Sequence, residues 1–70
     1  MLVELPSGRY VNLEAIAFIE PQIVKGLSGQ LPITLITSGG AGYKLPGKDA
    51  KVLLEELQRL GLITKLPVSS

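Results

Sequence analysis

A glycine-rich string near the middle of the chain has the spacing of a phosphate-binding loop. Gly42 is followed after four residues by Gly47 and Lys48, a pattern in which backbone N–H groups wrap phosphate and a lysine reaches its outer oxygens. A working loop continues with a Ser or Thr that binds Mg²⁺, whereas this chain continues with Asp49, whose carboxylate repels phosphate. A chain of 70 residues also has no room for the parallel sheet and second acidic motif of nucleotide hydrolases. We therefore interpret the match as coincidental.

Three lysines around this string could still form a simpler anion site. Lys44, Lys48 and Lys51 lie close to the start of a predicted helix, where unpaired N–H groups attract anions. The alternative is a solvated rim of charge, in which Asp49 partly balances Lys48 and Lys51. We favour the rim, because surface charges seldom act specifically.

Enzymatic chemistry has little support in the residue types present. The chain contains no His and no Cys, so the commonest acid–base group and the strongest nucleophile are both missing. Glu55 and Glu56 are the only adjacent acidic pair, and neighbours on a helix do not face each other. We predict a non-enzymatic protein with no catalytic residue, no cofactor and no metal ligand.

Aromatic and basic residues offer a second kind of candidate site. Proteins that bind single-stranded nucleic acid stack bases on aromatic side chains in a basic groove. Tyr10 and Tyr43 could serve in this way if the hairpins that carry them are adjacent, while Phe18 is expected in the core. The net charge of +1 disfavours this hypothesis. The candidate patch for an anion or nucleic acid comprises Arg9, Tyr10, Tyr43, Lys44, Lys48 and Lys51.

The composition indicates one small domain with more aliphatic residues than it can bury. Hydrophobic residues make up 46% of the chain, and there is no Cys to staple the fold. A domain of this size buries little more than half of its unfolded surface, and exposed apolar patches usually mark interfaces. We therefore predict a homo-oligomer, or a module that docks on another protein, and a cytoplasmic location because Cys is absent.

Neither a membrane span nor an export signal is predicted. No uninterrupted apolar run approaches the roughly 18–20 residues that cross a bilayer. The first residues also lack the basic stretch and apolar core of a signal peptide.

The first part of the chain predicts a β-hairpin. Residues 2–5 and 9–13 alternate apolar and polar side chains. Pro6-Ser7-Gly8 between them has the composition of a tight turn.

A short helical turn and a strand should follow this hairpin. Asn12 could cap a turn over residues 13–15. Residues 16–20 are expected to form a strand, because Pro21 bars a helix from continuing. A helix over residues 13–18 is the alternative, since the helix propensity there is acceptable.

The middle of the chain predicts a second hairpin. Residues 22–25 are expected to form a short strand or to continue the preceding one, and residues 26–32 a loop rich in Gly and Pro. Residues 33–37 are β-branched at four of five positions and predict the clearest strand. A glycine turn over residues 38–42 leads to a closing strand at residues 43–45.

An amphipathic helix is predicted over residues 49–60. Glu55 and Arg59 have the spacing and orientation of a favourable ion pair. Gly61 suits the left-handed position that ends a helix. The apolar stripe consists of Ala50, Leu53, Leu54, Leu57 and Leu60.

The last residues form an apolar tail that has little core left to cover. Ile63, Leu66 and Val68 favour burial, and Pro67 favours an edge position. The tail could fold back as an edge strand or dock on a neighbouring subunit.

The order of these short elements resembles that of a set of small bacterial proteins, the FlbD-like (swarming-motility) family. The strand rhythm is also similar in part to LytTR-type DNA-binding domains. The resemblance implies a non-enzymatic role in motility control, and it transfers no catalytic or ligand residue. The chain departs from the family in its long loop at residues 26–32 and in its apolar tail. The residues that carry the resemblance are Leu5-Pro6-Ser7-Gly8, Val11-Asn12-Leu13, Ile16, Ile19-Glu20 and Ile33-Thr34-Leu35.

Together these patterns predict an α+β fold, with a small curled antiparallel sheet of four to five short strands and one C-terminal helix packed on one face. Residues 1–62 should form a single domain, and residues 63–70 a tail that docks or lies at an interface through Ile63, Leu66 and Val68. The predicted function is a self-associating interaction or regulatory module, with weak nucleic-acid or anion binding as the alternative. The expected core contains Val3, Leu5, Val11, Leu13, Ile16, Phe18, Leu35, Leu53, Leu54 and Leu57.

Overall fold

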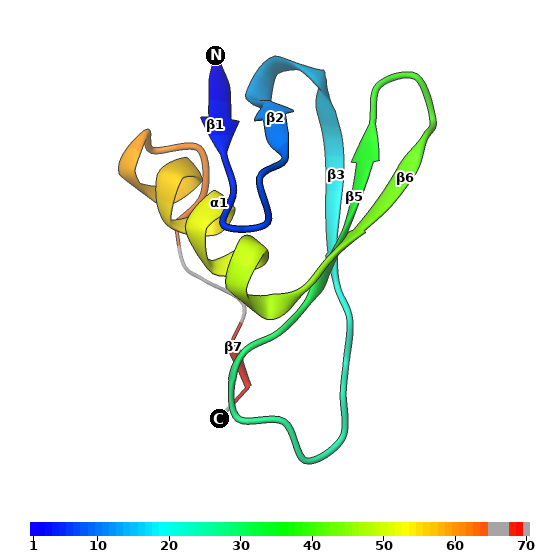
Figure 1. Ribbon diagram of the computed structural model, residues 1–70, viewed down its shortest axis with the longest axis vertical. Coiled ribbons are helices and arrows are strands. Elements are labelled where there is room, and N and C mark those ends of the chain that lie inside the picture. The colour runs from blue at the N-terminus through cyan, green and yellow to red at the C-terminus, as the bar shows by residue number, and fades with distance from the viewer. Residues whose placement is uncertain (65–67, 70) are drawn as a thin grey trace.

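The computed structural model describes residues 1–64 and 68–69, with side chains described for residues 1–64. Figure 1 shows the helix α1 on one side of the molecule and the strands β3, β5 and β6 on the other. In chain order the elements are β1 (Leu2–Glu4), β2 (Tyr10–Asn12), the 3₁₀ helix η1 (Leu13–Ala15), β3 (Ile16–Pro21), β4 (Gly29–Gln30), β5 (Ile33–Thr37), β6 (Gly42–Leu45), α1 (Gly47–Arg59) and β7 (Val68–Ser69).

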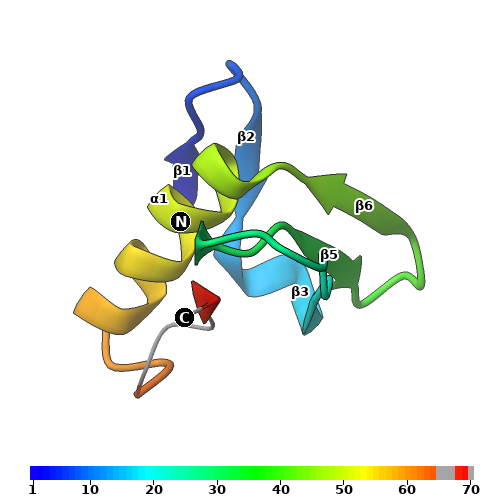
Figure 2. The ribbon, with the colours of Figure 1, turned by 90° about the horizontal axis from the view of Figure 1, so that it is seen from below.

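The strands of the described residues form three antiparallel ladders. β1 pairs with β2, β3-β5-β6 is a three-stranded sheet, and β4 pairs with β7. The predicted α+β fold with a C-terminal helix is confirmed. Its strands, however, are divided among three ladders and are not joined in one curled sheet. β1 lies beside α1 in both ribbon views (Figures 1 and 2).

The core lies where the apolar stripe of α1 meets the first hairpin and the inner face of the three-stranded sheet. Most of the expected core is buried, and Val3 and Ile16 are half-buried against it. The prediction omitted Ile33, Leu45 and Ala50, which are fully or almost fully buried. The buried apolar residues are Leu5, Val11, Leu13, Ile33, Leu35, Leu45, Ala50, Leu53, Leu54 and Leu57.

The prediction that Phe18 lies in the core is wrong, because its side chain is 63% exposed. β3 has a bulge between Ile16 and Phe18, where two steps along β3 match one step along β5. The extra residue, Ala17, shifts the alternation of side chains. Ile16 and Ile19 therefore share the inner face of the sheet, and Phe18 lies on the outer face.

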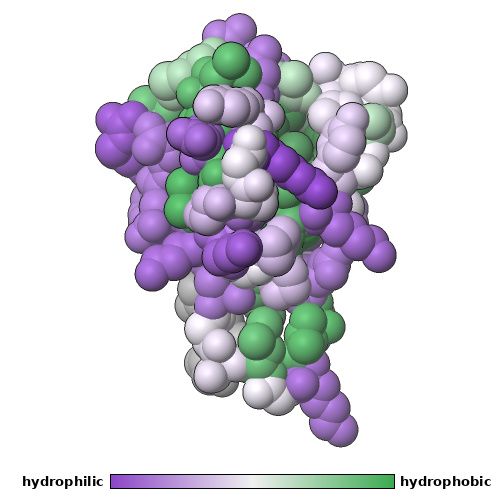
Figure 3. All heavy atoms as spheres, in the orientation of Figure 1, coloured by the Kyte–Doolittle hydropathy of each residue, from purple (hydrophilic) through white to green (hydrophobic). Residues whose placement is uncertain are grey.

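The strand expected at residues 22–25 is also absent, since β3 ends at Pro21 and a loop follows. Ile23 and Val24 in this loop are 92% and 44% exposed. Figure 3 shows hydrophobic atoms gathered at the lower end of the molecule, where Figure 1 places this loop. The expected loop over residues 26–32 contains the short strand β4.

The helix α1 begins two residues earlier than expected, at Gly47, and ends at Arg59. Leu60 follows the helix and is 38% exposed, so it does not extend the buried stripe. Arg59 pairs with Glu56 instead of the expected Glu55. The hydrogen bond from Arg59 lowers the pKa of Glu56, and the same contact raises the pKa of Arg59.

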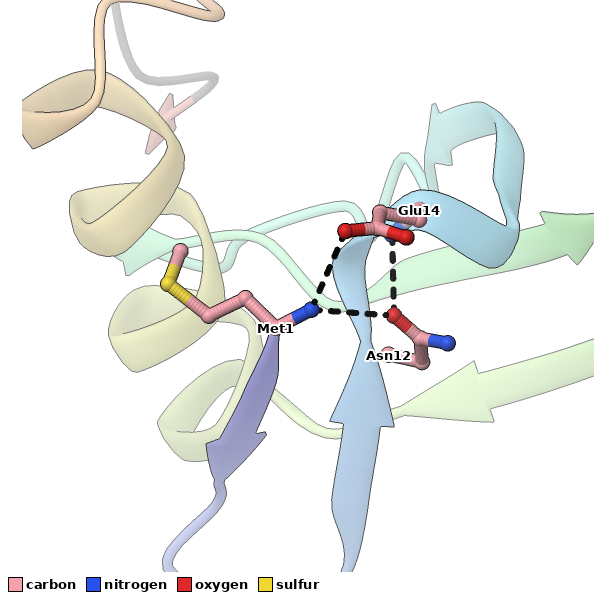
Figure 4. A network of polar contacts seen from close by, with 3 residues as sticks. All are labelled: Met1, Asn12 and Glu14. Atoms are coloured by element: carbon pink, nitrogen blue, oxygen red, sulfur yellow. Dashed lines mark hydrogen bonds and ion pairs between the residues drawn. The ribbon is translucent and has the colours of Figure 1, made fainter.

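The two predicted helix-end signals are confirmed. Asn12 caps η1, because its Oδ1 accepts a hydrogen bond of 3.1 Å from the N–H of Glu14. The amino group of Met1 also lies 3.4 Å from Asn12 Oδ1 and 3.4 Å from Glu14 Oε1 (Figure 4). At the end of α1, Gly61 has φ +78°. The N–H groups of Gly61 and Leu62 donate back to the helix, as in a Schellman motif.

Candidate functional site

The phosphate-loop string is not a loop in the folded chain. Residues 42–45 form β6, which pairs with β5, and Pro46 leads directly into α1. The string therefore does not present a run of free N–H groups to a phosphate. Gly47 also lies against β4, since a Cβ at this residue would be 2.8 Å from the carbonyl oxygen of Gln30.

The N-terminal end of α1 is occupied by a side chain of the protein itself. Asp49 is fully buried. Its Oδ1 accepts a hydrogen bond of 3.1 Å from the N–H of Ser7, and its Oδ2 accepts one of 2.5 Å from the Ser7 hydroxyl. The carboxylate complements the positive end of the helix and ties α1 to the turn between β1 and β2. This buried contact is incompatible with an external anion at the same place.

The three lysines of the expected anion patch are exposed and lie on different surfaces. Lys44 belongs to β6 and faces away from the neighbouring inward residue Leu45, because side chains alternate along a strand. Lys48 and Lys51 are on the exposed side of α1. None of the three is among the residues that line a groove. This arrangement agrees with the solvated rim that we favoured.

The other three residues of the predicted patch lie around a single groove. Arg9, Tyr10 and Tyr43 line one groove with a volume of about 540 Å³, although Tyr43 lies more than 30 residues after the other two in the chain. We call this the tyrosine groove. One wall is residues 9–12, the other is Tyr43 and Leu45, and the floor includes Ile16 and Leu35. The two tyrosines are 64% and 50% exposed.

A second groove of about 480 Å³ lies between β3 and the end of α1, and we call it the apolar groove. Its lining consists of Leu13 and residues 16–19 on one side and Leu57, Leu62 and Ile63 on the other. All of these side chains are apolar. Phe18 and Leu62 are each 63% exposed at its border.

Of the predicted interface residues, the structure describes one side chain. Ile63 is half-buried, packs against the core and lines the apolar groove. Leu66 lies outside the described residues. Val68 belongs to β7, which pairs with β4, so the backbone there folds back as the edge strand that the sequence allowed.

The sequence analysis missed two features of these sites. The contact between Ser7 and Asp49 joins residues 42 positions apart, and both residues have ordinary local explanations, as a turn residue and a helix-start residue. The apolar groove depends on the bulge at Ala17, which turns Phe18 outward. Phe18 was the available signal for it, as a large aromatic residue among aliphatic neighbours.

Comparison with known proteins adds no relative to this geometry. No protein-family model, no curated protein and no solved structure matches the chain. No helix in the part of the chain that the structure describes has the length and apolar character needed to cross a membrane.

Proposed function

We propose that this chain is a small, non-enzymatic interaction module of the cytoplasm that self-associates through the apolar groove. The observation that carries this proposal is that every side chain lining the groove is apolar, with Phe18 and Leu62 at its border, each 63% exposed. Apolar area removed from water contributes about 25 cal/mol per Å². Two large exposed side chains beside an unfilled apolar surface therefore favour association.

The geometry favours a second copy of the chain as the occupant. In a two-fold contact, each subunit uses the same surface, so one subunit's protruding side chain meets the other's groove. The apolar groove has both parts, because Phe18 protrudes and Leu57 and Ile63 line the hollow. Pairing between β3 strands is a weaker route, since Pro21 in this edge strand has no N–H to donate. Side-chain packing would therefore hold the dimer.

The test is the molar mass in solution, measured by size exclusion with light scattering over a range of concentrations. We expect a dimer or larger for the parent chain, and a monomer for Phe18→Ser and Leu62→Ser. Tyr10→Ser is the matched control, because Tyr10 is an aromatic residue of similar exposure, 64%, outside the apolar groove. A monomeric parent, or a Phe18→Ser variant with the parent's mass, would contradict the proposal.

The C-terminal tail contributes to the same proposal. Ile63 already lines the apolar groove, and Leu66 and Val68 extend the predicted contact. Removal of residues 65–70 is expected to weaken the dimer while Ile63 retains part of it. An unchanged mass and an unchanged unfolding temperature would remove the tail from the interface.

Binding of single-stranded nucleic acid or another anion is the second candidate function. The observation in its favour is that Arg9, Tyr10 and Tyr43 line one groove. Titration with short DNA or RNA at low salt tests it, because electrostatic affinity is greatest there. Loss of binding in Arg9→Ala and Lys44→Glu would support it, and no binding at low salt would contradict it. A role in motility control rests on the family resemblance and stays a prediction.

A further inference from the structure

The tyrosine groove lies between two ladders, and its strand β2 has no second partner strand among the described residues. β2 pairs with β1 alone, and β6 pairs with β5 alone. Residues 9–12 form one wall of the groove, and Tyr43 and Leu45 are part of the other. Figure 2 shows β2 and β6 diverging from the region where α1 begins. The groove is therefore an opening between two separate ladders.

The hydrogen bonds of β2 show which of its backbone groups face outward. The N–H of Leu5 donates to the carbonyl of Arg9, and the N–H of Leu13 donates to the carbonyl of Met1. In an antiparallel pair, residues that face the partner alternate with residues that face away. Tyr10 and Asn12 therefore direct their N–H and C=O groups away from β1, toward the free edge.

The same argument applies to β6. The N–H of Thr37 donates to the carbonyl of Ala41, and Leu35 pairs with Tyr43 further along the ladder. Alternation then places the backbone groups of Tyr43 toward β5 and those of Gly42 and Lys44 on the free edge. Gly42 and Lys44 do not line the groove, whereas Tyr10 and Asn12 do, so β2 is the edge that presents donors and acceptors to the groove in the spacing of a strand.

The lining of the groove defines the chemistry of an occupant. Its floor is apolar, with Ile16 and Leu35, and Leu45 and Val11 continue this surface at the sides. Arg9 is the only charged residue that lines it, and no carboxylate does. A volume of about 540 Å³ is in the range of ordinary ligand sites.

We propose that the tyrosine groove takes an extended peptide segment of a partner protein, which adds a strand to the free edge of β2. Main-chain hydrogen bonds to Tyr10 and Asn12 provide affinity, and the apolar floor receives alternate side chains. An acidic side chain of the peptide pairs with Arg9. This surface is distinct from the proposed dimer contact, so the two can be tested separately.

A peptide fits this groove better than a nucleic acid does. Free strand edges offer alternating donors and acceptors, which a second peptide backbone satisfies and a sugar-phosphate backbone does not. A single lining cation and a net charge of +1 also give little electrostatic attraction for a polyanion. The tyrosines then act as apolar walls with polar tips and not as stacking platforms.

The test begins with selection of short random peptides displayed on phage against the full chain. Tyr10→Pro and Tyr10→Ala form the matched pair of variants. Both remove the ring, but only proline removes the outward N–H, and an edge strand tolerates proline at such a position. We expect selected peptides to bind Tyr10→Pro about tenfold or more weakly than Tyr10→Ala. Acidic peptides should also bind Arg9→Ala more weakly.

A second measurement uses the parent protein, so it does not depend on a variant that could misfold. A selected peptide with N-methylated backbone amides should lose binding to the parent, because its side chains remain but its hydrogen bonds do not. Slowed amide exchange at Tyr10 and Asn12 on peptide binding would place the added strand at the free edge of β2. The proposal is overturned if no peptide is enriched, or if methylation leaves affinity unchanged. It is also overturned if an oligonucleotide, and no peptide, perturbs Tyr10 and Tyr43.

Discussion

At the scale of single residues, the buried carboxylate of Asp49 is the polar group on which the fold depends most. It accepts two hydrogen bonds from Ser7 and has no access to solvent. Removing a buried charged partner leaves its donors unsatisfied, at about 1.5–3 kcal/mol. We expect Asp49→Ala to lower the free energy of unfolding by about 2–3 kcal/mol, and Ser7→Ala to lower it by about 1–2 kcal/mol. Chemical denaturation measures both values.

The double variant Ser7→Ala/Asp49→Ala tests whether the two residues stabilise the protein through their mutual contact or independently of each other. Because the two residues are in direct contact, the loss in the double variant should be smaller than the sum of the single losses by about 1 kcal/mol. Lys48→Ala is the control, since Lys48 is the exposed neighbour of Asp49 and its loss should stay within about 0.5 kcal/mol. Additive losses would show that the contact does not stabilise the protein.

Sequence reasoning succeeded for residues whose role is local. Asn12 was expected to cap a turn and Gly61 to end the helix, and both do, because each acts on backbone groups within a few residues. Asp49 was interpreted as a charge that repels phosphate and partly balances Lys48 and Lys51. Its second role requires the turn at Ser7 to lie against α1, and nothing local in the sequence fixes that approach.

At the scale of elements, the bulge in β3 lets Ile16 and Ile19 share the inner face of the sheet while Phe18 lies on the outer face. Because Ala17 is the extra residue, its deletion leaves Ile16, Phe18 and Ile19 in regular alternation on the faces they already occupy. We therefore expect the Ala17 deletion to fold, with Phe18 still exposed. Circular dichroism and thermal unfolding test whether this variant folds, and NMR measures the solvent accessibility of Phe18.

Deletion of Glu20 is the control for the bulge. Glu20 pairs regularly with Thr34, so its loss shifts Pro21 and the following residues out of register. This variant should lose much more stability than the Ala17 deletion. Equal losses of stability in the two deletions would mean that the bulge is not at Ala17.

The close approach of α1 to β4 gives a prediction in which two effects oppose each other. Alanine is favoured over glycine inside a helix by about 1 kcal/mol. A Cβ at Gly47, however, would lie 2.8 Å from the backbone carbonyl oxygen of Gln30, and such overpacking costs about 1–3 kcal/mol. We expect Gly47→Ala to be destabilising by about 1 kcal/mol in chemical denaturation.

Gly39→Ala is the matched control for this substitution. Its nearest neighbour would be Thr37 Oγ1 at 3.9 Å, an ordinary contact, so its effect should be within about 0.5 kcal/mol. A stabilising Gly47→Ala would mean that helix propensity outweighs the contact between α1 and β4.

The elements themselves were largely predictable, and their register was less so. The clear strand at residues 33–37 and the helix stripe follow from composition and periodicity, and both are present. The expected strand at residues 22–25 had a suitable composition, but β3 ends at Pro21, and in this segment only Gln22 continues the pairing, through its N–H to the carbonyl of Pro32. Pairing is a long-range property, and a single-residue bulge changes it without a local signal.

At the scale of the whole molecule, separate ladders leave strand edges and grooves that one continuous sheet would close. The sequence predicted the apolar surplus from size and composition, and Phe18 and Leu62 now place part of it beside the apolar groove. It could not predict the division into three ladders, because that depends on how the first hairpin packs against α1 and the three-stranded sheet. The tyrosine groove results from the same division.

Self-association predicts that thermal stability depends on protein concentration. When folding is coupled to dimer formation, a hundredfold rise in concentration stabilises the dimer by about 2.7 kcal/mol. Half of this free energy applies to each small subunit, which corresponds to a rise in Tm of about 5–10 °C. We expect such a rise in calorimetric scans of the parent and none for Phe18→Ser, whose monomers cannot be stabilised in this way. Tyr10→Ser should keep the dependence, because Tyr10 lies outside the apolar groove. A parent Tm that does not change with concentration would leave Phe18 exposed in a monomer and would direct the search to a different protein partner.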